Sequence, residues 1–199
     1  MSASVALASR NPGKLREIRT ILADAGVPVN VVSAAEYPGW DAPEETEPDY
    51  AGNALLKARS LMSFAGVPAI ADDSGIEVDA LEGGPGPRSA RFAGDDATDE
   101  ENLHKLVEIV RTVPASARTA RYRCVAVLVT PAGRETVAEG TVEGTLITEP
   151  RGSGGFGYDP IFVPLGDRRT MAELPPSEKD RISHRGNAFR GLVDALRAL

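Results

Sequence analysis

The segment from residue 9 to residue 14 combines residue types that suit phosphate binding. It consists of Ser9, Arg10, Asn11, Pro12, Gly13 and Lys14, and it separates a short apolar run from a helical pattern. A helix N-terminus presents unpaired N–H groups and a partial positive charge, so anions bind there. Gly13 permits close backbone approach and Lys14 adds a cation. The segment is not a P-loop, because Leu15 follows the lysine where that motif has Ser or Thr. The alternative is a plain strand–turn–helix with a solvent-exposed lysine.

Two pairs of adjacent acids could hold a magnesium ion. Glu44 and Glu45 lie in a proline-rich loop, and Asp72 and Asp73 follow the apolar residues 69–71. Mg²⁺ binds one or two carboxylates, keeps several waters and takes substrate phosphates as its remaining ligands. A buried strand that ends in two acids also needs a metal, a cation or a helix N-terminus to compensate their charge. The alternative is a set of solvated loop acids, since the chain has a net charge of −7.

The residues around the second acidic pair predict a turn. Successive residues of a strand point to opposite sides, so Asp72 and Asp73 face one point only if the chain turns there. Ser74 and Gly75 follow directly and suit such a turn. The acidic run at residues 95–101 is different, because helix capping and the helix dipole account for its acids. We therefore assign that run no chemistry.

Asn53 and Lys57 are four residues apart on the helix predicted after the proline-rich loop. This spacing places both side chains on one edge of the helix, away from the centre of its apolar stripe. They could face a site reached from the sheet. An ordinary solvated helix flank is the better interpretation of these two residues taken alone.

A glycine-rich loop over residues 152–160 is the second candidate for ligand binding. The loop contains four glycines, at positions 152, 154, 155 and 157. Phe156 lies between the last two of them, and Tyr158 and Asp159 follow. The glycines free the backbone, while the aromatic rings offer faces to a flat ligand and Asp159 can accept a hydrogen bond. A tight hairpin loop is the alternative, but it does not explain the aromatic residues between the glycines.

Ser183, His184 and Arg185 mark the start of the last predicted helix. Ser183 fits an N-cap position and places the two cationic residues in the first turn, where their charge opposes the helix dipole. An anionic or electron-rich ligand would resolve that conflict, so the triplet is mild support for a binding site.

Three further residues receive no chemical role from the sequence. His104 falls on the polar flank of an amphipathic helix and is expected to be solvated. Cys124 falls within a predicted strand and is expected to be a small core residue. Trp40 lies in the proline-rich loop, where no pattern indicates what it does.

Hydrophobic periodicity predicts the elements that must position these residues. Strands are expected at residues 5–8, 29–32 and 67–71, with a hairpin formed by 121–130 and 135–144. Helices are expected from Lys14 to Gly26, after a capping box at residues 46–49, at 98–110 with Thr98 as its cap, and at 183–198. The early strands alternate with helices and the later ones pair, which predicts a mixed α/β or α+β sheet with flanking helices.

Composition narrows the classes of function. The chain has 199 residues, and its 22 Lys and Arg against 29 Asp and Glu argue against a bulk electrostatic grip on DNA or RNA. A few local cations can still hold one small anion. A single cysteine excludes an internal disulfide framework and is compatible with a reducing cytoplasm. No run approaches the ~20 apolar residues of a membrane span, and we expect no signal peptide.

Six motifs occur in a fixed order from Val5 to about Leu196. They are Ser9-x-Asn11-x-x-Lys14-x-x-Glu17, Glu44-Glu45-Thr46, Asn53-Ala54-x-x-Lys57-Ala58, Ala71-Asp72-Asp73-Ser74-Gly75, Gly154-Gly155-Phe156-Gly157-Tyr158-Asp159-Pro160 and Ser183-His184-Arg185-Gly186. With these motifs in this order, the chain resembles the inosine triphosphate pyrophosphatase family of non-standard purine nucleotide pyrophosphatases. No single motif decides this, but the set is highly specific and covers essentially the whole chain.

The resemblance implies a fold and an activity. The expected fold is a single domain over residues 1–199, with a central twisted mixed β-sheet, flanking helices and two lobes around a substrate cleft. A cytoplasmic homodimer is implied. The expected reaction is Mg²⁺-dependent hydrolysis of ITP, dITP and XTP to the monophosphate and pyrophosphate.

The resemblance also implies roles for individual residues. Asp73 would activate water as proton acceptor, with Lys14 and Lys57 as catalytic cations. Glu44 and Asp73 would be magnesium ligands, with Glu45 and Asp72 as further candidates. The substrate would contact Ser9, Arg10, Asn11, Pro12, Gly13, Lys14, Ser74, Phe156, Gly157, Tyr158, Asp159, Lys179, His184 and Arg185.

Two other functions stay open at this point. A pyrophosphatase for modified pyrimidine nucleotides, as in the Maf-like proteins, has a different motif set on a related architecture. A nucleotide sensor without turnover would bind the same ligands. The joint presence of Glu44, Asp73 and Lys14 argues against a sensor, because binding alone needs no carboxylate that activates water.

Overall fold

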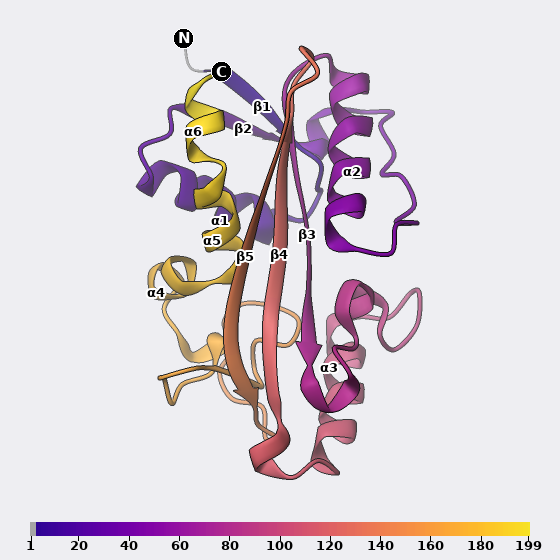
Figure 1. Cartoon of the computed structure of the whole chain (residues 1–199), viewed down its shortest axis with the longest axis vertical. Coiled ribbons are helices and arrows are strands. Elements are labelled where there is room, and N and C mark those ends of the chain that lie inside the picture. Colours follow the sequence, from indigo (N-terminus) through magenta and orange to yellow (C-terminus); the bar gives the residue numbers. More distant parts are fainter. Residues whose placement is uncertain (1–2) are drawn as a thin grey trace. The chain divides into compact units, whose positions relative to one another are not determined.

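A six-stranded mixed sheet organises the chain in this computed structural model, which describes residues 3–199 (Figure 1). The strands are β1 (Ala3–Leu7), β2 (Val29–Ser33), β3 (Ala69–Val78), β4 (Thr119–Val129), β5 (Glu135–Leu146) and β6 (Phe162–Pro164). Their order across the sheet is β2-β1-β3-β4-β5-β6. β1 pairs in parallel with both β2 and β3, whereas β5 and β6 are antiparallel. The predicted mixed α/β fold and the adjacent strands of the predicted hairpin are therefore confirmed.

Six α-helices accompany the sheet over the described residues. They are α1 (Pro12–Asp24), α2 (Tyr50–Ala65), α3 (Asp99–Arg111), α4 (Pro176–Ile182), α5 (His184–Gly191) and α6 (Val193–Arg197). Short 3₁₀ turns lie at Ala34–Glu36, Asp79–Leu81, Gly86–Arg91, Ala115–Ala117 and Met171–Glu173. None of the helices in residues 3–199 has the length and hydropathy that a transmembrane span requires.

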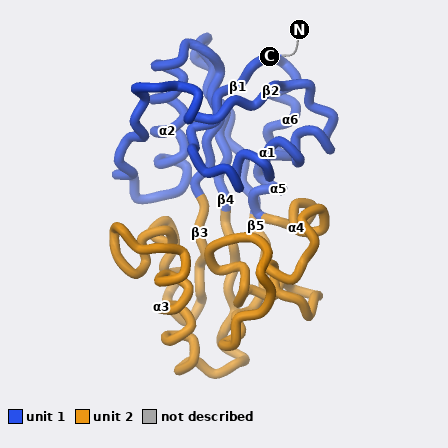
Figure 2. The backbone as a smooth tube through the Cα atoms, turned by 180° about the vertical axis from the view of Figure 1, so that it is seen from behind, with its two compact units in different colours: residues 1–73, 124–140, 184–199 blue, residues 74–123, 141–183 orange. Residues whose placement is uncertain are grey.

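The described chain divides into two compact units (Figure 2). Unit 1 contains residues up to 73, residues 124–140 and residues 184–199, and unit 2 contains residues 74–123 and 141–183. The strands β3, β4 and β5 each contribute residues to both units. The single domain over residues 1–199 stays a prediction, and its first two residues lie outside the described part. The predicted homodimer also stays a prediction.

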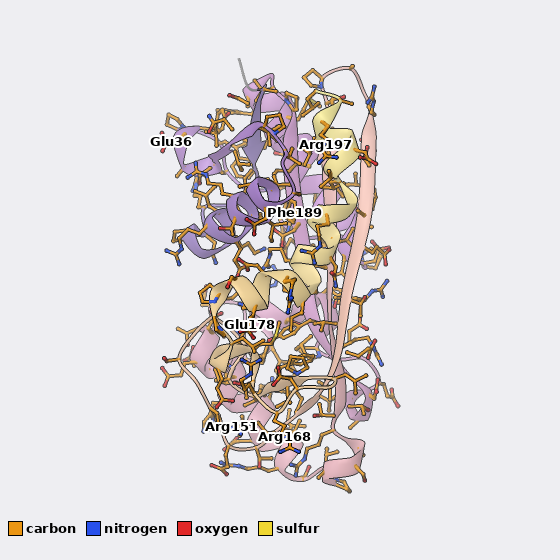
Figure 3. All side chains as sticks on the ribbon, turned by 90° about the vertical axis from the view of Figure 1, so that its left-hand side faces the viewer. Glu36, Arg151, Arg168, Glu178, Phe189 and Arg197 are labelled. Atoms are coloured by element: carbon orange, nitrogen blue, oxygen red, sulfur yellow. The ribbon has the colours of Figure 1, made fainter. Side chains whose placement is uncertain are left out.

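Unit 1 buries both faces of its strands. In β1, Val5 and Leu7 belong to a core with α1, α5 and α6, whereas Ala6 belongs to a second core with α2. The side chains of a strand alternate between faces, so a strand with helices on both sides reads as a continuous apolar run. Phe189 of α5, labelled in Figure 3, is fully buried in the first of these cores. Each site residue on these strands is therefore directed towards one helical layer or the other.

Unit 2 has one core of its own. Residues of α3 pack there with the second half of β3 and with Tyr122, Tyr158 and Phe162. Tyr158 is buried, and its hydroxyl donates a hydrogen bond to the carbonyl of Ser89 at 2.7 Å. One of the two aromatic residues of the glycine-rich loop is therefore committed to the core. The capping box predicted for the helix at 98–110 is confirmed, with Thr98 and Glu101 bonded reciprocally.

The predicted turn after Asp73 is wrong. β3 continues through Asp72, Asp73 and Ser74 as far as Val78. A strand tolerates these two charges because each has a cation or amide partner from another element. Gly75 does not form a turn. Its lack of a side chain matters because a Cβ there would lie 2.1 Å from the carbonyl oxygen of Gly86. The glycine permits a close backbone approach within unit 2.

Two predicted helix boundaries are also wrong. The helix α2 is capped by Asp49, whose carboxylate accepts from the Gly52 N–H at 2.7 Å, and not by the predicted box that starts at Thr46. The helix predicted at 183–198 is divided between α5 and α6. The break follows Gly191, a poor helix former that β5 approaches closely, since a Cβ there would lie 2.7 Å from the Cβ of Ala138.

Gly140 of β5 lets α5 approach the sheet in unit 1. A Cβ at this position would lie 2.1 Å from the His184 carbonyl oxygen and 2.4 Å from the Ala188 nitrogen. We expect Gly140→Ala to lower the free energy of unfolding by about 1–3 kcal/mol, because backbone atoms must move to relieve the overlap. Urea unfolding measures this change. Val137→Ala, at an exposed position of the same strand, is the control and should have a small effect. Equal stabilities for the two variants would contradict the packing described.

Candidate active site

The turn at residues 9–14 opens α1 as predicted. Asn11 is the N-cap, and its side-chain oxygen accepts from the N–H groups of Gly13 at 2.8 Å and Lys14 at 3.2 Å. Pro12 occupies the first turn, where its missing N–H costs nothing. Ser9 accepts from the Asn11 N–H at 3.2 Å. The cap thus uses two of the N–H groups that an anion could have taken, and the side chains of Arg10 and Lys14 supply the positive charge of the turn.

A buried ion cluster joins this turn to β3 and α5. Asp72 Oδ2 accepts from Lys14 Nζ at 3.0 Å and from Arg185 Nε at 3.2 Å, and Arg185 Nη1 donates to Glu17 at 2.7 Å. Burial alone would raise the pKa of Asp72, but the charges of Lys14 and Arg185 outweigh it and hold that pKa well below its usual range. The conflict predicted between Arg185 and its helix dipole is therefore relieved by two carboxylates of the chain itself.

A second cluster lies on the α2 side of β3. Lys57 Nζ donates to Asp73 Oδ1 at 3.1 Å and to Glu45 Oε1 at 3.0 Å. The Asn53 amide nitrogen lies 3.5 Å from Asp73 Oδ2. Burial raises the pKa of Asp73, and the charge of Lys57 offsets this only in part. Burial lowers the pKa of Lys57, but Asp73 and Glu45 outweigh it, so that pKa lies above its ordinary value and the lysine stays charged.

The alternation of β3 thus separates the two adjacent aspartates. Asp72 meets cations from α1 and α5, and Asp73 meets Lys57 and Asn53 of α2. A pocket of about 280 Å³ adjoins both clusters. It is lined by Ala8, Ser9, Arg10, Lys14, Trp40, Ala42, Glu45, Lys57 and Asp72. The pocket combines three cations with two carboxylates, which suits a polyanion together with a metal ion.

The carboxylates of unit 1 fit a magnesium ion that takes most of its ligands from elsewhere. No group of three or more His, Cys, Asp or Glu side chains within residues 3–199 could hold a metal by itself. Magnesium usually has only one or two protein carboxylates and completes its shell with water and phosphate. Asp73 and Glu45 share one lysine, and the buried Oδ1 of Asp72 has no hydrogen-bond partner among the described residues. Glu44, the residue before Glu45 in the sequence, is exposed.

A third cluster lies in unit 2, at the glycine-rich loop. Lys179 Nζ of α4 lies 2.8 Å from Asp159 Oδ2 and 5.1 Å from the centre of the Phe156 ring. The same carboxylate oxygen accepts from the Phe156 N–H at 2.9 Å. Gly155 has φ +72, and a Cβ there would lie 2.0 Å from that oxygen. The glycine is therefore required for the loop to wrap around Asp159. The Asp159 carboxylate in turn holds the Phe156 backbone and the Lys179 ammonium group in place.

The remaining predicted residues are placed as follows. Ser74 is half-buried in β3 and belongs to unit 2. His184 is buried as the first residue of α5 in unit 1. Gly157 donates its N–H to Asp99 at 3.2 Å. The roles predicted for all these site residues stay predictions.

Sequence reasoning gave no role to two residues that hold the clusters in place. Glu17, quoted only as the end of the first motif, pairs with Arg185, and Asp99 accepts from the glycine-rich loop. Asn53 was singled out with Lys57, but the solvated helix flank preferred for these two residues is wrong, because both are buried and Asn53 bonds the loop before α2. Glu17 lies three residues after Lys14, so helical spacing places both on one face of α1 and could have found it. Asp99 was assigned only to helix capping, and no local signal links it to a loop so far along the chain.

Cys124 and His104 are as predicted. The thiol of Cys124 is fully buried, and burial together with the nearby Asp72 carboxylate raises its pKa far above the ordinary range. His104 is exposed on α3 and lies 3.9 Å from Glu108. Neither residue belongs to the described clusters as a reactive group.

Comparison with known proteins places this arrangement in a family. Residues 5–195 match the model of the Ham1 family. The chain belongs to the Ham1 family. It is 50% identical to a dITP/XTP pyrophosphatase of Streptomyces coelicolor, over 97% of this chain and 96% of that one. It is 47% identical to a dITP/XTP pyrophosphatase of Escherichia coli K12, over 97% and 98%.

Solved structures of Ham1 proteins agree with this assignment. A HAM1 protein from Coxiella burnetii superposes with a TM-score of 0.87 at 39% identity, covering 99% of this chain and 100% of that one. A dITP/XTP pyrophosphatase from Mycobacterium abscessus gives a TM-score of 0.76 at 44% identity, with 98% and 100% coverage. The resemblance inferred from the six motifs is confirmed.

Asp72 neutralises two cations in the interior of unit 1, so its removal should be costly. We expect Asp72→Asn to lower the free energy of unfolding at pH 7 by about 3–5 kcal/mol, because Lys14 and Arg185 lose a buried counter-charge. The wild-type contribution of Asp72 is fully present above about pH 4, the range of an unfolded aspartate, and is lost as the pH falls towards the depressed native pKa.

Urea unfolding between pH 3 and pH 7 measures both effects. The stability of Asp72→Asn should depend less on pH in the acid range than that of the wild type. Asp24→Asn, at an exposed acid near the end of α1, should leave the stability and its pH dependence almost unchanged. A variant at position 72 that matches the wild type over this range would refute the electrostatic account.

Proposed function

We propose that this member of the Ham1 family hydrolyses non-standard purine nucleoside triphosphates, namely ITP, dITP and XTP, to the monophosphate and pyrophosphate. The observation that carries the proposal is the pocket of unit 1, where Lys14 and Lys57 are each paired with one of two adjacent aspartates. The similarity to enzymes named dITP/XTP pyrophosphatase supports the choice of substrate. A cytoplasmic location fits a substrate from the nucleotide pool, and it stays a prediction.

The triphosphate would bind at the turn before α1. Ser9, Asn11 and Lys14 are positioned there by the cap, and Arg10 also lines the pocket. Lys14 and Lys57 would neutralise charge on the phosphate chain and on the leaving pyrophosphate. Magnesium, when bound, would be held by Asp73 and by Glu44 or Glu45, with Asp72 as a further candidate, and would supply additional positive charge for the leaving group.

Asp73 would accept the proton of the attacking water. The oxygen of the water forms a bond to the α-phosphorus while the bond from that phosphorus to the bridging oxygen breaks, and pyrophosphate leaves with the electron pair. Burial has already raised the pKa of Asp73, which makes its carboxylate a better base. Lys57 and Asn53 fix the orientation of that carboxylate.

The base would be recognised by donors. Hypoxanthine and xanthine carry a 6-oxo acceptor, whereas adenine carries an amino donor at that position. Lys179 is held by Asp159 beside the Phe156 ring and can donate to the oxo group. The roles implied for His184 and Arg185 at the base stay predictions. Adenine would leave such donors unpaired, which would weaken its binding free energy by about 1–3 kcal/mol for each unpaired group. Guanine shares the 6-oxo group, so its rejection requires a further contact.

A nucleotide panel tests the proposed function. With Mg²⁺ and purified protein, kcat/KM for ITP and XTP should exceed that for ATP by about 100-fold or more, because unpaired buried donors discriminate strongly. Pyrophosphate release is the quantity to measure. Comparable hydrolysis of ATP, or release of orthophosphate, would refute the proposal. Preference for a modified pyrimidine nucleotide would favour a Maf-like activity, and tight ITP binding without product would favour a sensor.

Substitution of the proposed base tests the mechanism. We expect Asp73→Asn to lower kcat about 10²–10⁴-fold at saturating Mg²⁺, because the amide cannot accept the proton of the water. Steady-state pyrophosphate release from ITP measures the loss. Asp96→Asn, in the exposed acidic run of unit 2, is the matched control and should keep wild-type turnover. Near-normal turnover of the Asp73 variant would remove this residue from the mechanism.

A further inference from the structure

Trp40 is the residue whose position the sequence left unexplained. It is the single tryptophan of the chain, it lies in the loop before α2, and only 3% of its surface is exposed. Its ring packs in the core between α2 and the sheet of unit 1. We refer to residues 40–47, which contain the acidic pair Glu44 and Glu45, as the acidic loop.

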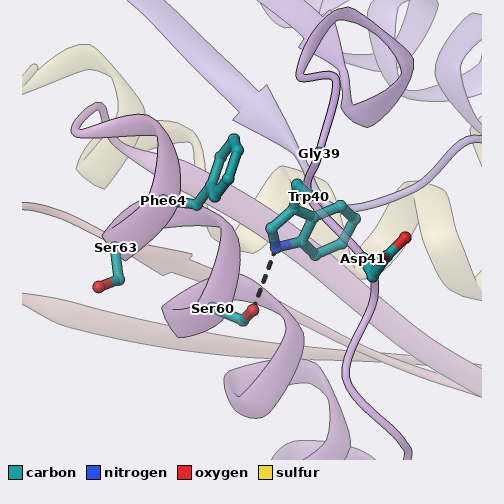
Figure 4. A pocket seen from close by; sticks show the side chains of 6 residues that line it. All are labelled: Gly39, Trp40, Asp41, Ser60, Ser63 and Phe64. Carbon is teal, nitrogen blue, oxygen red and sulfur yellow. Dashed lines mark hydrogen bonds between the residues drawn. The ribbon is translucent and has the colours of Figure 1, made fainter.

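The acidic loop is tied to α2 at three points. The Trp40 indole N–H donates to Ser60 Oγ at 3.1 Å, as Figure 4 shows. Glu45 accepts from Lys57 at 3.0 Å. The Glu47 backbone donates to the Asn53 side chain at 3.0 Å and accepts from it at 3.2 Å.

These ties follow a regular order. Loop positions 40, 45 and 47 meet helix positions 60, 57 and 53, so the acidic loop runs antiparallel to α2. Helix residues spaced by three and four share one face, which is why one side of α2 can hold the whole loop. The central tie is the ion pair that faces Asp73, and the outer two are hydrogen bonds from uncharged groups.

Trp40 also connects the acidic loop to the phosphate-binding turn. Arg10 donates from its guanidinium group to the Trp40 carbonyl oxygen. The residue lines the pocket of about 280 Å³ that contains Lys14, Glu45 and Lys57. It also lines an outer pocket of about 450 Å³ with Ser60, Ser63 and Phe64 (Figure 4). Trp40 therefore stands between the proposed active site and the outer surface of unit 1.

The central ion pair holds the acidic loop at one point only, between the ends of two long side chains. One such contact leaves the backbone on either side of Glu45 free to shift, because long side chains can rotate while they keep an ion pair. The loop would then sample many positions for its carboxylates. The Trp40–Ser60 bond fixes the loop at one end and the Asn53 bonds fix it at the other, so the carboxylates between them stay opposite Lys57 and Asp73.

We propose that Trp40 is a positioning residue, which holds the acidic carboxylates of this loop in register with Lys57 and Asp73 through its bond to Ser60. The proposal rests on the proposed function, because it gives those carboxylates a part in binding magnesium with the phosphates. It predicts that loss of the bond weakens phosphate binding mainly when magnesium is scarce.

Variants of α2 test this without changing a residue that lines the pocket of about 280 Å³. Ser60→Ala removes the acceptor, Ser60→Thr retains a hydroxyl, and Ser63→Ala is a matched control on the same helix that also lines the outer pocket. Calorimetry with inorganic pyrophosphate at limiting and saturating MgCl₂ is the main measurement. We expect Ser60→Ala to weaken binding about 3–10-fold at limiting MgCl₂ and less than 2-fold at saturation. Ser60→Thr and Ser63→Ala should behave as the wild type.

Tryptophan fluorescence supplies a readout that needs neither magnesium nor turnover. Quenching by acrylamide should increase in Ser60→Ala and stay at the wild-type level in Ser63→Ala, because only the first frees the indole. Trp40→Phe should reproduce the magnesium dependence of Ser60→Ala, and the serine variants suffice if it does not fold. The proposal is overturned if Ser60→Ala binds pyrophosphate as Ser63→Ala does, or if saturating MgCl₂ fails to restore its binding. A wild type that binds magnesium pyrophosphate but leaves ITP intact would refute the proposed function and not this assignment.

Discussion

The charges on two adjacent residues of a strand buried on both faces constrain the arrangement of unit 1. Asp72 and Asp73 bond to different side chains of the described residues, because their own side chains leave β3 in opposite directions. Each needs its own compensation, and the helices on the two faces supply it. Lys14 of α1 and Arg185 of α5 meet one carboxylate, while Lys57 of α2 meets the other. Three helices are thereby bound to a single pair of residues.

The same constraint gives the two carboxylates different acidities. On one face, the pKa of Asp72 is held low by its cations, so this carboxylate serves as a fixed counter-charge. On the other face, burial raises the pKa of Asp73, so this carboxylate is more basic and suits proton transfer. Neighbouring residues of one strand acquire opposite chemical character from the layers they face.

Local patterns in the sequence predicted much of this arrangement. The turn before α1 and the shared edge of Asn53 and Lys57 follow from short-range spacing. The spacing did not show that those two residues are buried, or that the glycine-rich loop wraps around Asp159. The continuation of β3 through its two aspartates does not follow from spacing either, because the compensating Arg185 lies 113 residues further along the chain. The contact of Glu45 with Lys57, and the bond from Trp40 to Ser60, depend on the course of a loop that has no periodicity. Composition could show the acids and cations but not their pairing.

The division of unit 1 into three separate stretches of sequence has a consequence for its biosynthesis. Its core combines β1 and α1 from the start of the chain with Phe189 and Leu196 from the end. A ribosome therefore releases Asp72 and Lys14 long before Arg185 is available to them. Until the last residues are synthesised, the apolar face of the first segment and the carboxylate of Asp72 are exposed to solvent. Contacts between such distant segments form slowly, so the core of unit 1 is completed only after the C-terminal helices have been made.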